Sequence, residues 1–288
     1  MRNLLKSQSR KSRLALTGAA VAALVAIPAG LAAASTGSPA SPASPASPAS
    51  PASAAPKPTI VIEHGAWVDG SSFNAVVARL QQDGYTVDVP PNPLRGPASD
   101  SAYLAAYLAA VKGPVVLVGH SYGGFVTTDA ATGDKDVMAL VYVDAYLPAQ
   151  GETINSINAK FPGSLITPAA LSFVPSPGGV TDAYVQPSQF ASIFANDLPK
   201  SEAAVLAATQ EPISAAALAG ASTAPAWASI PSWDVIGTAD HAIAPAAQEF
   251  MAARAHAKVT EVNASHLSMI SHPATVAAVI EQAARATS

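Results

Sequence analysis

The sequence predicts an α/β fold: a mostly parallel, doubly wound sheet with helices on both of its faces. Short runs of β-branched and apolar residues recur from residue 58 onwards, and most precede a segment with apolar side chains at helical spacing. Strands that are buried on both faces form continuous apolar runs, whereas strands with one wet face alternate apolar and polar residues. The alternation of such strands with helices therefore favours parallel strands joined by crossover helices.

The alternation is regular in the first part of this domain and again near its end. Strands are expected at 59–62, 85–89, 115–118, 137–143, 232–237 and 258–262, and helices at 71–83, 99–111, 123–132, 245–255 and from 273 onwards. Each of the last two helices begins with a proline, which is favourable where the missing N–H would have no helical partner.

Between Leu147 and about Ile230 the alternation stops, because prolines interrupt short helical patches and no strong strand run appears. We therefore expect a helical cap inserted at about 147–230. Its aromatic side chains have two interpretations: they line an apolar pocket, or they form the small core of the insertion itself. They are Phe161, Phe173, Tyr184, Phe190, Phe194 and Trp227.

Composition limits the class of protein. Of the 288 residues, 50% are hydrophobic and 12% are charged, which is enough apolar material for a substantial core. All 19 acidic residues follow residue 56, so the domain is acidic, which argues against nucleic acid and other anionic partners. The chain has no cysteine, so disulfides, thiolate metal sites and a cysteine nucleophile are excluded.

The first 57 residues do not resemble a folded domain. Basic residues within 1–13, an apolar stretch at 14–34 and small residues at Ala32 to Ala34 predict an export signal at 1–34. An uncleaved membrane anchor is the alternative, because the stretch is nearly long enough to span a bilayer. Repeated Ser-Pro-Ala predicts an extended, disordered linker at 35–57. We expect a secreted protein, with no stable membrane association after cleavage, whose domain covers 58–288.

The pattern Gly119-x-Ser121-x-Gly123 directly follows an apolar strand run and precedes a helical segment. A serine on such a strand–turn–helix junction is a nucleophile elbow, in which small glycines leave room for a strained turn that exposes the hydroxyl. We therefore predict that Ser121 is a nucleophile.

An elbow serine needs a base, and the elbow arrangement places an acid and then a histidine later in the chain. His266 is the predicted base, because it follows the final strand and so lies at the sheet edge where Ser121 must lie. Two acids follow strands, Asp240 and Asp144, and the residues alone leave both open. The backbone N–H groups of Tyr122 and Ala66 are the expected oxyanion donors, one after the nucleophile and one in the first strand-to-helix loop.

With these motifs, the domain resembles the α/β-hydrolase superfamily over residues 58–288. It is most similar to the small serine esterase branch that includes plant methylesterases, hydroxynitrile lyases and bacterial esterases. The residues that carry the resemblance are His64-Gly65-Ala66-Trp67, Gly119-His120-Ser121-Tyr122-Gly123-Gly124, Asp240 and His266, with Ser271-His272-Pro273 behind it. The resemblance implies the triad Ser121, Asp240 and His266, favours Asp240 over Asp144, and places Trp67 at the substrate.

The expected protein is a secreted hydrolase that cleaves small-molecule carboxylic esters through an acyl-enzyme, without a cofactor or a metal. Perhydrolysis, in which peroxide replaces water, uses the same three residues and is the first alternative. A non-catalytic binding module that keeps the hydrolase pocket is the second. The branch's lyases have a lysine directly after the catalytic histidine, where this chain has Leu267. Cyanohydrin cleavage by their route is therefore not expected.

Overall fold

The computed structural model describes residues 57–287. The export signal predicted at 1–34 and nearly all of the linker predicted at 35–57 lie outside these residues, so both stay predictions. Among the described residues, no helix combines the length and the apolar character needed to cross a membrane.

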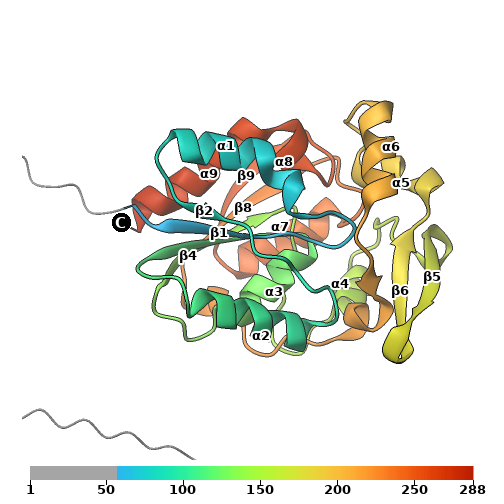
Figure 1. Ribbon diagram of the computed structural model, residues 1–288, viewed down its shortest axis with the longest axis horizontal. Coiled ribbons are helices and arrows are strands. Elements are labelled where there is room, and N and C mark those ends of the chain that lie inside the picture. Colours follow the sequence, from blue (N-terminus) through green and yellow to red (C-terminus); the bar gives the residue numbers. More distant parts are fainter. Residues whose placement is uncertain (1–56, 288) are drawn as a thin grey trace, which may run out of the picture. The chain divides into compact units, whose positions relative to one another are not determined.

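A six-stranded sheet runs through the centre of the domain (Figure 1), in the order β2-β1-β3-β4-β8-β9. Every neighbouring pair in it is parallel, which confirms the predicted parallel sheet. The strands are β1 (Thr59–Glu63), β2 (Val87–Asp88), β3 (Val115–His120), β4 (Val137–Val143), β8 (Ser232–Gly237) and β9 (Lys258–Val262). β2 is shorter than the expected 85–89, because it is an edge strand that pairs only with β1 and is soon followed by Pro90 and Pro91, which cannot donate to a ladder.

Helices cover both faces of this sheet, as predicted. Figure 1 shows α1 and α9 on one side and α2 and α3 on the other. The helices outside the cap are η1 (Gly70–Phe73), α1 (Asn74–Gln82), α2 (Pro97–Leu108), α3 (Tyr122–Ala130), α7 (Pro245–Arg254), α8 (Ser268–Ser271) and α9 (Pro273–Ala286). The amphipathic α9 buries Val276, Val279 and Ile280, and the inner strands β1, β3, β4 and β8 are almost completely buried.

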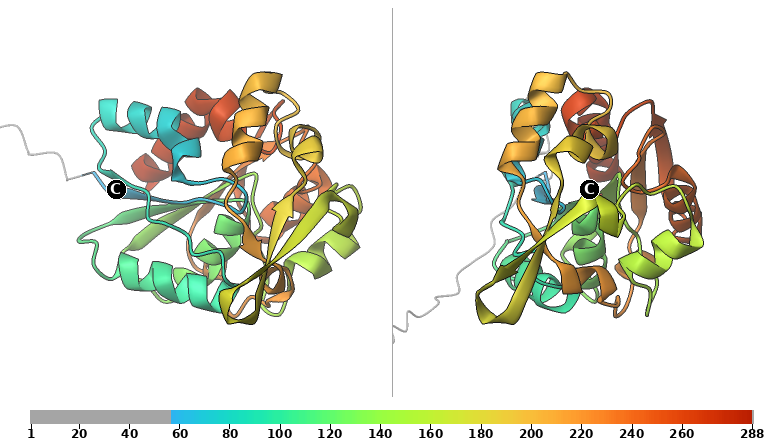
Figure 2. Two further views of the ribbon diagram at one scale, coloured as in Figure 1. Left: turned by 45° about the vertical axis from the view of Figure 1, so that its right-hand side comes forward. Right: turned by 90° about the vertical axis from the view of Figure 1, so that its right-hand side faces the viewer.

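The segment between β4 and β8 forms a cap at the carboxyl ends of the strands (Figures 1 and 2). Its helices are α4 (Ile154–Lys160), η2 (Pro168–Ala170), η3 (Pro177–Gly179), α5 (Pro187–Phe194), α6 (Lys200–Thr209), η4 (Ala215–Ala219) and η5 (Ala226–Ala228). It also contains an antiparallel sheet in the order β5-β6-β7, formed by β5 (Leu171–Ser176), β6 (Val180–Val185) and β7 (Ile213–Ser214).

This small sheet corrects the expectation of a cap without strands. β5 was missed because it contains Pro175 and most of its side chains are exposed, so it lacks an apolar run. A local signal was present in Gly178 and Gly179, which both adopt positive φ, 79° and 78°, at the tight turn between β5 and β6. Three residues, Pro177 to Gly179, connect the paired Ser176 and Val180, and glycine is favoured in such short hairpin connections because it adopts positive φ without steric cost.

Hydrogen bonds join the cap to the loops at the edge of the central sheet. The Trp67 N–H donates to the Glu211 carbonyl (2.9 Å), and the Trp67 indole Nε1–H donates to the Ala183 carbonyl on β6 (2.8 Å). On another side, the Ser265 hydroxyl donates to the Phe194 carbonyl (2.8 Å), at the end of α5. The cap therefore contacts both the loop after β1 and the loop after β9.

Candidate active site

Ser121 stands between the last residue of β3 and the first residue of α3, as the elbow motif predicts. Its backbone has φ 53° and ψ −123°, a combination that is rare for a residue with a side chain and costs on the order of 1–3 kcal/mol. Gly123 makes the turn possible, because a Cβ at this position would collide with the carbonyl oxygens of Glu63 and His64. The strained turn is therefore held by close packing against the end of β1.

A chain of two hydrogen bonds links Ser121 to His266 and His266 to Asp240. The distance from Ser121 Oγ to His266 Nε2 is 2.8 Å, and the distance from His266 Nδ1 to Asp240 Oδ2 is 2.7 Å. The three residues come from three loops at the carboxyl edge of the sheet, after β3, β8 and β9. Parallel strands end at the same edge, so residues separated by 145 positions in sequence meet there.

Three amide groups around Asp240 favour its ionised form. Oδ1 accepts from the N–H groups of Ala242 (2.7 Å) and Ile243 (3.0 Å), and Oδ2 accepts from the Gln248 side-chain amide (2.7 Å) as well as from His266. Burial raises the pKa of Asp240, and these donors oppose that shift. The three amide N–H donors cannot accept a proton from the carboxyl group, so their hydrogen bonds favour the carboxylate.

Asp144, the rival acid, has different partners. Its Oδ1 accepts from the Gly237 N–H (2.7 Å), and its Oδ2 accepts from the N–H (3.2 Å) and the hydroxyl (2.5 Å) of Ser268. The structure thus brings Asp240 to His266 and leaves Asp144 bridging the end of β8 to α8. Burial, followed by the charge of Asp240, raises the pKa of the Asp144 carboxyl.

His266 is completely buried, and this burial lowers its pKa below the ordinary value of 6.5. The imidazole is therefore neutral at neutral pH. With Nδ1–H donating to Asp240, Nε2 is left as the acceptor that faces the Ser121 hydroxyl. The ring of Phe194 contacts the imidazole edge-on at 5.0 Å between centroids, and His120 Nε2–H donates to the His266 carbonyl (3.0 Å).

The two predicted oxyanion donors, Ala66 and Tyr122, lie beside Ser121 in the wall of one pocket. Neither backbone N–H donates to another described residue, so both are available to a ligand. Gly65 lets the loop after β1 come this close, since a Cβ on it would lie 2.7 Å from Ser121 Cβ. His64 organises the same loop, because its Nε2 accepts from the Asn92 N–H (3.1 Å).

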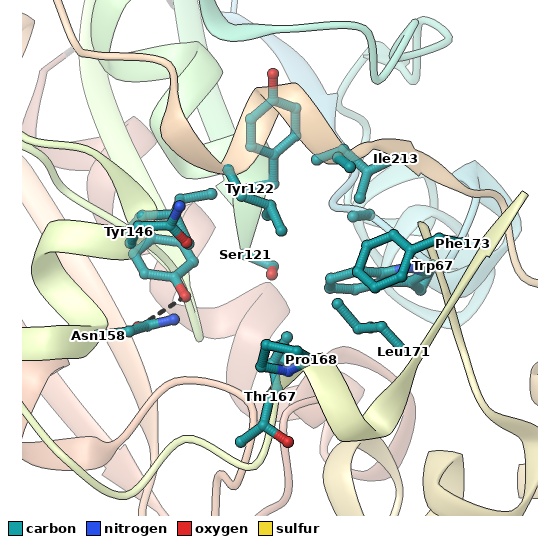
Figure 3. A pocket seen from close by; sticks show the side chains of 16 residues that line it. Trp67, Ser121, Tyr122, Tyr146, Asn158, Thr167, Pro168, Leu171, Phe173 and Ile213 are labelled. Atoms are coloured by element: carbon teal, nitrogen blue, oxygen red, sulfur yellow. Dashed lines mark hydrogen bonds between the residues drawn. The ribbon is translucent and has the colours of Figure 1, made fainter. Parts of the chain in front are cut away.

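The pocket above Ser121 has a volume of about 230 Å³ and is mostly apolar (Figure 3). Trp67, predicted to contact the substrate, lines it, and its backbone takes the left-handed conformation at φ 61°. Of the six aromatic residues in the cap, Phe173 lines the pocket, whereas Phe190 and Phe194 are buried in the core. The pocket interpretation therefore applies to Phe173, whereas Phe190 and Phe194 belong to the main core of the domain rather than to a separate core of the insertion.

Three side chains at the site were not foreseen. Gln248 holds Asp240, and Tyr146 and Asn158 line the pocket and are hydrogen-bonded to each other (3.1 Å). Tyr146 could have been found, because it closely follows β4 at the edge where the site forms. Asn158 has no such signal, since it lies on a short helix of the cap. Within residues 57–287, no group of three or more His, Asp or Glu side chains is arranged to hold a metal ion.

Comparisons with known proteins agree with this fold. The model of the alpha/beta hydrolase family matches residues 60–279. A carbendazim hydrolyzing esterase from Nocardioides sp. (strain SG-4G) is 31% identical in an alignment 113 residues long, which covers 35% of this chain and 47% of that protein. The matched region thus spans about half the length of that curated relative.

Solved structures of similar fold include polyneuridine aldehyde esterase, with a TM-score of 0.68 and 19% identity over 79% of this chain and 99% of that one. A pyrethroid hydrolase from Sphingobium faniae JZ-2 has a TM-score of 0.64 and 24% identity over 80% and 98% of the two chains. A point mutant of tomato methylketone synthase I has a TM-score of 0.67 and 16% identity over 81% and 99%. With its parallel sheet, its strand–turn–helix junction at Ser121 and a family match from residue 60 to residue 279, the chain belongs to the alpha/beta hydrolase family.

Proposed function

We propose that this protein is a serine hydrolase that cleaves carboxylic esters through an acyl-enzyme intermediate. The observation that carries the proposal is the buried hydrogen-bond chain from Ser121 through His266 to Asp240, at the wall of a pocket that also contains two free backbone donors. The esterase names of proteins similar to this chain support an ester as the substrate.

In the first half of the reaction, Ser121 Oγ attacks the ester carbonyl carbon while its proton moves to His266 Nε2. Negative charge develops on the carbonyl oxygen, and the N–H groups of Ala66 and Tyr122 stabilise it. Asp240 stabilises the imidazolium through Nδ1–H and keeps the ring in place. When the intermediate collapses, His266 returns the proton to the departing alcohol, and the acyl group stays on Ser121.

In the second half, a water molecule attacks the acyl carbon while His266 accepts its proton. The same two N–H groups stabilise the second oxyanion. Collapse releases the carboxylic acid and returns the proton to Ser121 Oγ. The side chains of Trp67 and of the cap residues around the pocket would contact the two arms of the ester.

Labelling with a fluorophosphonate tests the proposal, because this reagent reacts only with an activated serine. We expect one adduct, on Ser121, that is lost in Ser121→Ala. Ser101→Ala is the matched control, since Ser101 is also buried but donates to the Val126 carbonyl (3.2 Å), and this variant should be labelled normally. Folded protein that takes up no label would contradict the proposal and favour a binding module.

We further propose that residues 1–34 direct export and that the mature protein is extracellular. The basic start, the apolar stretch and the small residues before Ser35 support this. The intact mass of protein from the culture medium should correspond to a start near Ser35, whereas full-length protein found only in membranes would indicate an uncleaved anchor.

A further inference from the structure

The pocket has two unlike sides, and Ser121 lies between them (Figure 3). On one side are Trp67, Leu171 and Phe173, with Ile213 near them, and all of these are apolar at the pocket surface. On the other side are Tyr146 and Asn158, which present neutral polar groups. An ester bound with its carbonyl carbon at Ser121 Oγ must send its acyl arm and its alcohol arm in different directions. The two sides can therefore select the two arms separately.

The polar side is fixed relative to the nucleophile. The Tyr146 N–H donates to the Ser121 carbonyl (3.2 Å), so the tyrosine backbone is bonded to the residue that reacts. The tyrosine side chain is buried, and its hydroxyl donates to Asn158 Oδ1 at 3.1 Å. This hydrogen bond orients the asparagine amide, which lies on α4 of the cap.

The hydrogen bond leaves a donor available to a ligand. Because Asn158 Oδ1 accepts the tyrosine proton, the Asn158 Nδ2 group is left with two N–H donors, and neither has a partner among the described residues. Tyr146 has already donated its only hydroxyl proton. The pair therefore favours a hydrogen-bond acceptor in the pocket over a hydrocarbon group, since an acceptor satisfies donors that hydrocarbon would leave unpaired.

Charge on the ligand is disfavoured at the same place. None of the described residues that line the pocket has a charged side chain. A carboxylate or an ammonium group entering this pocket would lose water without gaining a counter-charge, which is costly. The acceptor that fits is a neutral one, such as an ether or a carbonyl oxygen.

We propose that this pocket is specific for neutral esters with two unlike arms. One arm is apolar and packs against Trp67, Leu171 and Phe173, and the other carries a neutral hydrogen-bond acceptor that binds Asn158 Nδ2. The inference rests on the proposed ester hydrolysis at Ser121 and adds a subsite to it. Tyr146 acts in the subsite as a positioning residue, because it orients the asparagine.

Pairs of isosteric esters test the subsite. In the acyl arm, p-nitrophenyl methoxyacetate is compared with p-nitrophenyl butanoate, and in the alcohol arm, 2-methoxyethyl benzoate is compared with butyl benzoate. For each pair, the ratio of kcat/KM values is measured in the wild type and in Asn158→Leu, so that intrinsic differences in ester reactivity cancel. In one of the two arms, we expect the ratio of kcat/KM for the ether to kcat/KM for the hydrocarbon ester to be about two- to tenfold higher in the wild type than in Asn158→Leu. This range corresponds to one neutral hydrogen bond.

Two further variants separate the subsite from general damage to the pocket. Tyr146→Phe keeps the ring but loses the hydroxyl that orients Asn158, and it should lose part of the same ether preference. Phe173→Leu, on the opposite side of Ser121, is the matched control: it should lower kcat/KM for both members of a pair and leave their ratio unchanged. Tyr146→Phe also keeps the test decisive if Asn158→Leu folds poorly.

The outcomes also separate the two proposals. Hydrolysis with the same ether preference in the wild type, Asn158→Leu and Tyr146→Phe, in both arms, would overturn the subsite and leave ester hydrolysis standing. If the kcat/KM ratio of an ester pair changes as much in Phe173→Leu as in Asn158→Leu, the subsite proposal is overturned too. No hydrolysis of any of the four esters, together with no labelling of Ser121, would overturn both the subsite and the proposed function.

Discussion

Asp240 and Asp144 are both buried carboxyl groups after parallel strands, but only Asp240 accepts from His266. In Asp240→Asn, an amide N–H would face Nδ1 and favour the tautomer that carries its proton on Nε2, which cannot accept the Ser121 proton. We expect kcat to fall by about 10⁴, the loss known for this change in serine proteases. Asp144→Asn should lower the free energy of unfolding instead, and change kcat about tenfold or less. The kcat values of the two variants are compared in samples with the same folded fraction. A larger loss in Asp144→Asn than in Asp240→Asn would contradict this assignment.

The pH profile should report His266. The base must be neutral to accept a proton, so kcat/KM should fall as the pH drops through the pKa of His266. Burial lowers that pKa, so the acidic inflection is expected below the ordinary 6.5, with about a tenfold loss for each further pH unit. Stopped assays of kcat/KM from pH 2 to pH 8 check this, because burial lowers the pKa of His266 to about 3. An inflection above 6.5 would show that Asp240 outweighs burial, and a profile that stays flat down to pH 2 in folded protein would argue against a histidine base.

The residues of the site differ in how far the sequence could identify them. Ser121 and His266 followed from one motif and from chain order at a shared sheet edge. The acid could not be chosen from the residues alone, since Asp144 and Asp240 both follow strands, and the choice depends on where the loop before α7 places its N–H groups. Asn158 could not be found at all, because its position depends on how the cap folds over the sheet.

At the scale of elements, Trp67 links the cap to the loop after β1, which carries the proposed oxyanion donor Ala66. Its indole N–H donates to β6, and its ring contacts Phe194 edge-on at 5.6 Å, while Phe194 in turn contacts His266. Trp67→Phe keeps a ring against Phe194 but leaves the Ala183 carbonyl without its donor, which should cost about 1–3 kcal/mol of stability. Ala66 directly precedes Trp67, so a shift of Trp67 would also move the Ala66 N–H away from the developing oxyanion. Loss of that one hydrogen bond from the transition state should lower kcat by about tenfold.

Trp227→Phe is the matched control for this variant. The Trp227 indole also donates to a backbone carbonyl, that of Pro148 (2.9 Å), but Trp227 does not line the pocket. It should lose stability in urea unfolding with little change in kcat. Equal effects of the two variants on kcat would mean that Trp67 acts only through general stability of the cap.

The elements themselves were predictable where burial dictates the sequence. The strands β1, β3 and β4 contain continuous apolar runs, because helices cover both faces of the sheet there. The edge strand β9 is largely exposed and has polar residues between its two valines. The cap follows another rule: β5 is largely exposed, β7 has only two residues, and their pairing is set by the turn at Gly178 and by contacts with the domain. Such strands carry little hydrophobic pattern of their own.

At the scale of the whole molecule, some buried acids make the free energy of unfolding fall as the pH rises, which is the opposite of the usual effect of acidic residues. Glu63 is fully buried at the end of β1, and neither of its carboxyl oxygens has a hydrogen-bond partner. Burial, followed by the charge of Asp100, raises its pKa well above 4.5. The folded state then holds a proton that the unfolded state releases. The contribution of Glu63 to the free energy of unfolding is fully present below about pH 4.5. Above that pH it falls by about 1.4 kcal/mol per pH unit, up to the pKa that Glu63 has in the folded state.

Glu63→Gln should remove this dependence. We expect a higher free energy of unfolding than in the wild type at pH 8, a smaller gain at pH 6, and little or no gain near pH 4.5, measured by urea unfolding at each pH. Glu249→Gln, at an exposed position of α7, is the control and should leave the slope unchanged. A Glu63→Gln variant with the wild-type slope would show that Glu63 is ionised in the folded protein.

The attachment of the cap at two places has a consequence for how such a protein can diversify. Its residues hold the backbone of Trp67 on one side of Ser121 and the loop that carries His266 on the other. An exchange of this insertion for that of another hydrolase would therefore alter the proposed catalytic residues together with the choice of substrate. New specificities should be reached more readily by changing individual side chains inside the pocket than by recombining whole caps.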